Sequence, residues 1–238
     1  MGAIPLPKRV LLKLSGEALK GDRPFGISNP VITDIASQIK QATDLGIQVA
    51  VVTGGGNFFR GNRQEDLDID RASADYMGML ATILNGIALQ DAFEKQGLTT
   101  RMMSALEITE VAEPFIRRRA VRHLEKGRVV IFAAGTGSPF FSTDTAAALR
   151  AIEIKADILL KATMVDGVFS DDPHRVKDVK RFDTISYSEV LSRELKVIDS
   201  TAVTLCKENN LRIKIFKLSN RGNIFKAITN RDIGTIIK

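Results

Sequence analysis

The hydrophobic pattern of the chain alternates between two kinds of segment. Apolar runs with little polar alternation are typical of strands buried on both faces of a parallel sheet, and they lie at 8–15, 49–53, 99–104, 128–134, 157–161, 212–218 and 234–237. Segments with apolar residues at helical spacing lie at 29–46, 70–96, 116–126, 144–154, 196–206 and 224–229, with a short helix after Ser186. Repeated strand–helix–strand units predict one α/β domain over residues 1–238, a three-layer α/β/α sandwich with a mainly parallel sheet.

Residues at the boundaries of these segments predict where helices begin and where the chain turns. Asn29 is the expected N-cap of the first long helix. Ser142 or Thr143 is the expected N-cap of the helix at 144–154. The pair Asp166 and Gly167, flanked by valines, is typical of a tight hairpin. The helix at 70–96 is apolar around much of its circumference, so we expect it to be buried on more than one side.

Three consecutive glycines follow the strand at 49–53. Gly54, Gly55 and Gly56 lack a Cβ and tolerate positive φ, so their N–H groups can converge on an anion. Arg60 follows with a forked donor suited to phosphate oxygens. A tight turn without a ligand is the alternative, but ligands bind at the carboxyl ends of parallel strands, which favours a phosphate site.

Two lysines occupy similar places at the ends of predicted strands. Lys13 and Lys161 interrupt apolar runs, where an ammonium group is costly unless it reaches an anion or water. An edge strand with its lysine in solvent is the alternative for Lys13. Asp144, or Asp199 inside the helix at 196–206, could hold a lysine or Mg²⁺ in place.

A second glycine-rich segment, 135–144, joins a strand to a helix. Its small hydroxyl residues and the helix N-terminus favour another anion site, and the adjacent Phe140 and Phe141 suggest that it closes over a ligand. Asp75 lies near the start of the long helix. Its carboxylate either interacts favourably with the helix dipole or faces the glycine loop and accepts a hydrogen bond from a hydroxyl group.

Composition and charge narrow the classes of function. One cysteine excludes an intramolecular disulfide and suits a reducing cytoplasm, where we expect the protein to reside. No apolar segment reaches membrane-spanning length. The net charge of +6 is dispersed, and two tyrosines with no tryptophan offer few stacking platforms, so phosphorylated small ligands are favoured over nucleic acid.

The sequence lacks motifs and residues that several enzyme classes require. There is no G-x-x-x-x-G-K-[ST] motif, and Phe59 and Phe140 interrupt G-x-G-x-x-G in the two glycine segments. His123 and His174 are expected to face solvent, which disfavours zinc hydrolases and Ser-His-Asp enzymes. Glycines, lysines and carboxylates at strand ends suit phosphoryl transfer, so the residues predict a kinase of a phosphorylated or carboxylated small molecule.

Four motifs carry a resemblance to a known family. They are KLSGE at 13–17, GGGNxxRG at 54–61, GTGxPFFxTD at 135–144 and KATxVDGVF at 161–169. Together, in this order and spacing, they resemble the bacterial UMP kinases of the amino-acid kinase fold. The resemblance covers essentially the whole chain. It implies transfer of the ATP γ-phosphoryl group to UMP with Mg²⁺, in pyrimidine nucleotide synthesis, by a homohexamer that GTP activates and UTP inhibits.

The resemblance also implies roles for individual residues. Catalysis would involve Lys13, Asp144, Asp199 and Lys161. ATP would contact Lys13, Leu14, Ser15, Gly16, Gly56, Arg60, Thr163, Phe169 and Asp172. UMP would contact Gly55, Asp75, Thr136, Gly137, Ser138, Pro139, Phe140, Phe141, Ser142 and Thr143. GTP activation would involve Gly21, Asp22, Arg23, Pro24, Phe25 and Gly26, and no metal-ligating set is assigned to the protein.

Two alternatives remain at this point. A carbamate, acetylglutamate or aspartate kinase would use the same fold, but Asp75 and the Pro-Phe-Phe segment fit a ribose better than a carboxylate acceptor. A nucleotide-sensing regulatory protein that binds DNA is consistent with the basic charge. The presence of Lys13, Asp144 and Lys161 argues against lost catalysis.

Overall fold

The structure, a computed structural model, describes residues 6–59, 68–170, 179–218, 222–229 and 233–238. In this part of the chain nine strands form one sheet in the order β4-β3-β5-β2-β1-β6-β10-β11-β9. Their bounds, in that order, are Glu113–Pro114, Thr100–Ser104, Val129–Ala133, Gln48–Thr53, Arg9–Leu14, Ile158–Thr163, Arg212–Lys217, Thr235–Ile237 and Thr184–Ile185. Within this nine-stranded sheet only the β10–β11 pairing is antiparallel, so the prediction of a mainly parallel sheet is confirmed.

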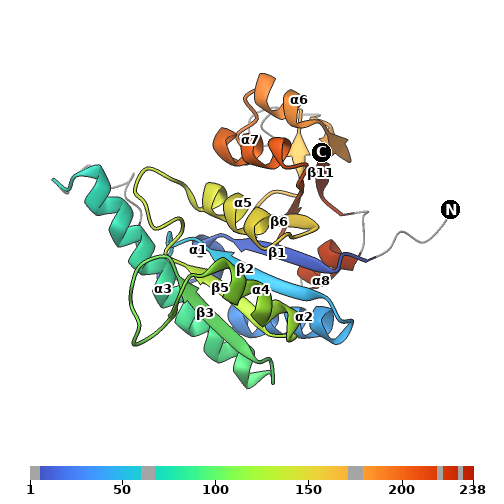
Figure 1. The fold of residues 1–238 in the computed structure, drawn as a ribbon. Helices are drawn as coiled ribbons and strands as arrows, with labels where there is room; N and C mark the ends of the chain where they lie inside the picture. The colour runs from blue at the N-terminus through green and yellow to red at the C-terminus, as the bar shows by residue number, and fades with distance from the viewer. Residues whose placement is uncertain (1–5, 60–67, 171–178, 219–221, 230–232) are drawn as a thin grey trace.

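Helices cover both faces of this sheet (Figure 1). One layer holds α1 (Gly16–Leu19), α2 (Asn29–Asp44), α3 (Arg71–Lys95) and α8 (Asn223–Thr229), and the other holds α4 (Arg117–Glu125), α5 (Thr143–Glu153), α6 (Tyr187–Ser192) and α7 (Ser200–Glu208). Alternation along the central strand β1 sets the layers, because Val10, Leu12 and Leu14 pack in the first layer and Leu11 packs in the second. The three-layer prediction is therefore confirmed.

Three local predictions are wrong. Ser28, not Asn29, is the N-cap of α2, and Asn29 is already helical. Asp166 and Gly167 do not turn a hairpin, because β7 (Val168–Phe169) pairs antiparallel with the distant β8 (Arg181–Phe182). Asp199 lies outside α7 as its N-cap, since its carboxylate accepts a hydrogen bond from the Ala202 N–H at 2.8 Å. For Asp199 a side-chain cap, and for Asp166 and Gly167 a long-range strand pairing, decides the local structure, and the local apolar pattern records neither.

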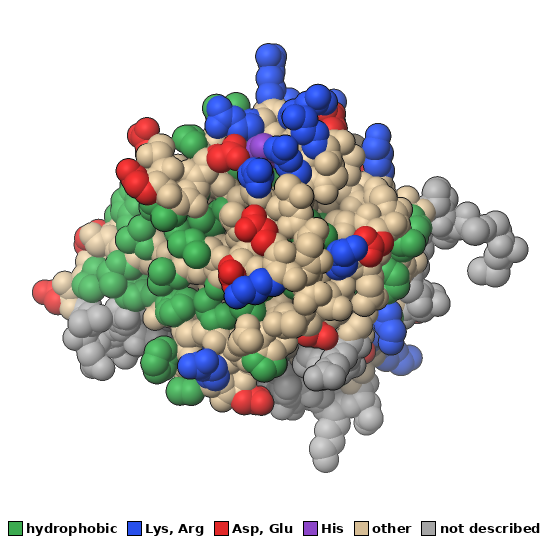
Figure 2. Space-filling model, turned by 90° about the horizontal axis from the view of Figure 1, so that it is seen from below, with side chains coloured by type: hydrophobic (Ala, Val, Ile, Leu, Met, Phe, Trp, Pro, Cys, Tyr) green, Lys and Arg blue, Asp and Glu red, His purple; other side chains and the backbone are tan. Residues whose placement is uncertain are grey.

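The outer face of α3 is apolar and exposed, which contradicts the expectation that this helix is buried on more than one side. Its exposed apolar side chains are Tyr76, Met77, Leu80, Leu84 and Ile87, each between 39% and 50% exposed. Figure 2 shows hydrophobic side chains gathered on the side of the molecule where α3 lies. Among the described residues, the structure holds no helix that combines the length and apolarity needed to cross a membrane.

Candidate active site

Two lysines from neighbouring central strands meet one carboxylate. Lys13 of β1 and Lys161 of β6 are partners in the parallel register, so their side chains leave the same face of the sheet, towards α5. Asp144 lies in the first turn of α5. Its Oδ1 is 2.8 Å from Lys13 Nζ, and Lys161 Nζ donates a hydrogen bond to its Oδ2. β1 lies between β2 and β6, so the edge-strand alternative for Lys13 is wrong.

The electrostatics of this cluster follow from its burial. The three side chains are only 11–12% exposed. Burial by itself would raise the pKa of Asp144, but Lys13 and Lys161 together outweigh burial and hold that pKa below its ordinary value. Burial lowers the pKa of Lys161, although its ion pair with Asp144 opposes the shift. Two ammonium groups around one carboxylate leave a net positive site, which suits an incoming phosphate chain.

Asp199 holds the N-terminus of α5. Ser142 is the N-cap of α5, and its Oγ accepts from the Asp144 N–H at 3.0 Å and the Thr145 N–H at 3.1 Å. The Asp199 carboxylate accepts from the Ser142 hydroxyl and, at 3.0 Å, from Thr145 Oγ1. Asp199 therefore orients Asp144 through the helix cap, while Thr143 is the first helical residue. The structure thus brings the two predicted carboxylates together: Asp144 contacts the lysines, and Asp199 contacts the cap of α5.

The glycine loop lies directly against the start of α1. A Cβ on Gly16 would be 2.6 Å from both Gly54 O and Gly56 N, so only glycine allows the two segments this approach. A Cβ on Gly55 would be 2.6 Å from Gly78 O of α3. Leu14 is fully buried, and Ser15 is the N-cap of α1. The predicted phosphate-facing segments are thus in contact, and Arg60 lies outside the described residues.

The segment 136–143 is joined to α3 through Asp75. The Phe140 N–H donates to Asp75 Oδ2 at 2.7 Å, and Arg71 Nε lies 3.0 Å from the same oxygen. Asp75 thus faces this segment rather than the glycine loop. Phe140 and Phe141 are 69% and 53% exposed, and Gly137 has a φ of +83°. Within the segment the Ser138 N–H donates to Thr136 Oγ1 at 3.2 Å, and Pro139 comes next.

The remaining predicted residues lie at two other places. Thr163 ends β6, where its hydroxyl donates to Val165 O at 2.7 Å, and Phe169 lies in β7. Asp172 lies outside the described residues. The predicted effector segment comprises Gly21, Asp22, Arg23, Pro24, Phe25 and Gly26, which form the connection after α1. The last of these is bonded to the glycine loop, since the Gly26 N–H donates to Asn57 O at 3.0 Å.

His123 is buried, so the prediction that it faces solvent is wrong. It is 8% exposed, with Nε2 at 3.1 Å from Glu113 Oε2 and Nδ1 at 3.0 Å from Arg128 Nη1. An arginine can only donate, so Nδ1 accepts and the Nε2–H donates to Glu113. This interaction belongs to the end of α4 rather than to the lysine cluster. His174 lies outside the described residues.

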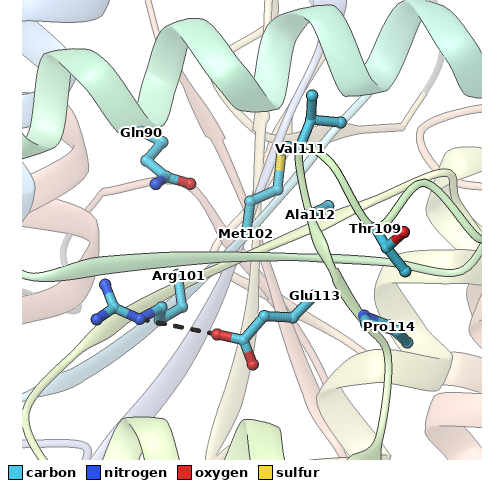
Figure 3. Close-up of a pocket in the computed structure, with 8 residues that line it drawn as sticks. All are labelled: Gln90, Arg101, Met102, Thr109, Val111, Ala112, Glu113 and Pro114. Carbon is cyan, nitrogen blue, oxygen red and sulfur yellow. Dashed lines mark ion pairs between the residues drawn. The ribbon is translucent and has the colours of Figure 1, made fainter.

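A pocket of about 330 Å³ lies apart from the lysine cluster (Figure 3). It is lined by Gln90, Arg101, Met102, Thr109, Val111, Ala112, Glu113 and Pro114, with Arg101 Nε 3.7 Å from Glu113 Oε1. Among the residues that the structure describes, none predicted to bind a substrate lines it. The pocket therefore adds no group to the proposed chemistry at the strand ends.

Sequence reasoning missed three buried polar residues that hold the strand ends. Asn57 belongs to a motif in which it has no predicted role, and Thr82 and Asn85 lie in the helix predicted to be largely apolar. Asn85 Nδ2 donates to Gly54 O at 2.8 Å, and Thr82 Oγ1 accepts from the Ala134 N–H at 2.8 Å. A polar residue on the buried side of a helix was the available signal.

In the described part of the chain, the carboxylates of the site do not form a cluster of metal ligands. Within the described ranges no group of three or more His, Cys, Asp or Glu side chains could hold an ion. Both carboxylate oxygens of Asp144 already contact ammonium groups. Mg²⁺ commonly binds through substrate phosphates with few protein ligands. An ion held in that way would require no ligand cluster from the described residues.

Known proteins share this fold over nearly the whole chain. The Amino acid kinase family profile matches residues 8–217. The UMP kinase from Bacillus anthracis, whose structure is solved, is 38% identical in sequence. The match covers 98% of this chain and 97% of the B. anthracis chain, with a TM-score of 0.95. UMP kinase from Ureaplasma parvum is 36% identical, with 97% and 98% covered and a TM-score of 0.93. Uridylate kinase from Archaeoglobus fulgidus is 30% identical, with 96% and 99% covered and a TM-score of 0.75. The chain belongs to the amino acid kinase family.

Proposed function

We propose that the protein is a UMP kinase that transfers the γ-phosphoryl group of ATP to UMP and releases UDP and ADP. The observation that carries this is the buried cluster of Lys13, Asp144 and Lys161 at the carboxyl ends of adjacent strands. Solved UMP kinases with TM-scores of 0.95 and 0.93 support the choice of acceptor. The product UDP serves pyrimidine nucleotide synthesis, and we infer that the enzyme works in the cytoplasm.

The lysines supply the main chemical contribution. Phosphoryl transfer spreads negative charge over the equatorial oxygens, so catalysis depends on positioning and on cations fixed in advance. Asp144 holds both ammonium groups in place and stays ionised beside them. Lys13 and Lys161 then face the donor and acceptor phosphates from adjacent strands. Mg²⁺, if it arrives with ATP, would supply further positive charge to the donor phosphates.

The two nucleotides occupy different walls of this site. On the ATP side we place Ser15, Gly16, Gly56, Thr163 and Phe169, together with Arg60 and Asp172 from outside the described residues. On the UMP side we place Gly55 and the segment 136–143. The Asp75 carboxylate, now bonded to the Phe140 N–H, accepts from the ribose of UMP. A carboxylate accepts several hydrogen bonds at once, so Asp75 can serve the Phe140 N–H and a ribose hydroxyl together.

Regulation and assembly are the finer parts of the proposal. GTP activates through the segment 21–26, whose Gly26 is bonded to the glycine loop, and UTP inhibits. The exposed apolar face of α3 supports assembly of copies into a homohexamer, since apolar side chains gathered on one face are characteristic of interaction surfaces. Light scattering tests this, because Leu84→Glu on that face should reduce the assembled mass.

A panel of acceptors tests the function. ADP release is measured with ATP and Mg²⁺ plus UMP, CMP, AMP, carbamate or acetylglutamate, with UDP identified by chromatography. We expect turnover with UMP and much less with the other nucleotides. Equal turnover of carbamate or acetylglutamate would instead assign another kinase of the same fold. The absence of turnover with every acceptor would favour a regulatory protein.

A further inference from the structure

Two buried asparagines form a closed amide pair beside the site. Asn57 and Asn85 are 3% and 0% exposed. Each Nδ2 donates to the Oδ1 of the other residue at 2.8 Å. Asn85 Nδ2 also donates to Gly54 O, and Asn57 Nδ2 also donates to Gly26 O, both at 2.8 Å. Carbonyl oxygens only accept, so these contacts fix the orientation of both amides and use all four of their hydrogens.

The pair connects three segments that bind ligands in the proposed function. Asn85 binds the glycine loop, and Asn57 binds Gly26 through its side chain and also accepts from the Gly26 N–H at 3.0 Å. A Cβ on Gly16 would lie 2.7 Å from Asn57 Oδ1, so the start of α1 rests on the same pair. Apolar side chains would fill a core as well, so buried amides here point to a need for orientation rather than packing.

The orientation that matters is that of the Gly54–Gly55 peptide. The carbonyl and N–H of a trans peptide point in opposite directions. Asn85 Nδ2 and, at 3.1 Å, Thr53 Oγ1 hold Gly54 O on the buried side. The Gly55 N–H is therefore turned away from the pair. Two successive glycines would otherwise let this peptide plane rotate at little steric cost.

We propose that Asn57 and Asn85 are positioning residues for phosphoryl transfer, which fix the peptide planes of the glycine loop and tie them to the segment 21–26. The proposal rests on the proposed function, because it takes the glycine loop as a phosphate-binding wall. Neither asparagine needs to touch a substrate. Loss of either amide should leave the fold standing and disorder the donors that meet the phosphates.

The test compares Asn85→Ala, Asn57→Ala and the double variant with Tyr187→Phe. Tyr187 donates a buried hydrogen bond to Leu211 O at 2.6 Å, next to the amino end of β10, so its loss costs stability away from the site. Titration calorimetry with Mg·ATP separates the two effects. Stoichiometry reports the folded fraction, and the dissociation constant reports the geometry of the site. UDP formation is measured in parallel.

Gly56, on the proposed ATP side, directly follows the peptide that Asn85 restrains, and Gly55 lies on the proposed UMP side. Each asparagine variant should therefore weaken ATP binding about 10-fold and lower kcat/KM for UMP roughly 10- to 100-fold at unchanged stoichiometry. The double variant should lose little more than the worse single variant, since the pair acts as a unit. Tyr187→Phe should stay near wild type in both readouts.

Three outcomes are distinguishable. Wild-type protein that binds ATP but forms no UDP would refute the proposed function, and the binding comparison would still judge the pair. Asparagine variants with ATP affinity and turnover within threefold of Tyr187→Phe would overturn the positioning role. Failure of both single variants to fold would overturn it as well, because the pair would then be required for the fold itself.

Discussion

Replacing Asp144 by asparagine removes the charge that holds two buried ammonium groups and leaves the shape of the side chain unchanged. At 2.8 Å and an effective dielectric constant of about 20, the attraction to Lys13 is about 6 kcal/mol before desolvation is subtracted. Removal of one partner from a buried ion pair costs about 3–5 kcal/mol. For a chain of this size that loss lowers Tm by roughly 6–20 °C.

Calorimetric or circular-dichroism melting measures the effect, and two further variants sharpen it. Asp91→Asn makes the same chemical change in the exposed ion pair with Lys95 and should cost about 0.5 kcal/mol or less. Adding Lys161→Met to Asp144→Asn removes the repulsion between the two lysines, so the double variant should melt above Asp144→Asn. A Tm within 2 °C of wild type for Asp144→Asn, or strictly additive effects, would refute the ion-pair reasoning.

Three more predictions concern neighbouring groups. Lys13→Met should lower kcat roughly 10²- to 10³-fold in the ADP-release assay and keep a cooperative melt, because Lys161 still pairs with Asp144; near-normal turnover would contradict it. Because the folded pKa of Asp144 lies below the ordinary 3.8, its contribution to stability is complete above about pH 5 and fades as pH falls below 3.8. Urea unfolding between pH 3 and 7 should therefore show the gap between wild type and Asp144→Asn shrinking only at the acid end. Burial raises the pKa of the Cys206 thiol to about 12, so a disulfide reagent should leave it unmodified in native protein and titrate one thiol in guanidinium; fast native reaction would argue against its burial.

The strand ends were predictable because parallel strands align their carboxyl ends. A lysine in an apolar run, at Lys13 and again at Lys161, predicted that each ammonium group reaches an anion or water. The sheet register then explains why two residues 148 positions apart meet one carboxylate, since they are direct partners across β1 and β6. The layer arrangement followed from the same apolar alternation.

Other parts of the site have no local signature. Whether Asp199 extends a helix or caps it depends on Ser142 and Thr145, which are more than 50 residues away. The burial of His123 depends on Glu113 and Arg128. Such contacts arise only when elements pack, so a one-dimensional pattern cannot rank them.

The pairing of Lys13 with Lys161 also makes the proposed catalytic cluster depend on the register of β1. A slip of β1 by one residue would turn Lys13 to the layer of α2 and α3, where leucines and isoleucines of the apolar core are packed. It would also leave Asp144 with a single cation. Molecules with a register error in β1 should therefore be inactive in the proposed reaction as well as unstable. Specific activity then reports the fraction of molecules in which β1 has the correct register.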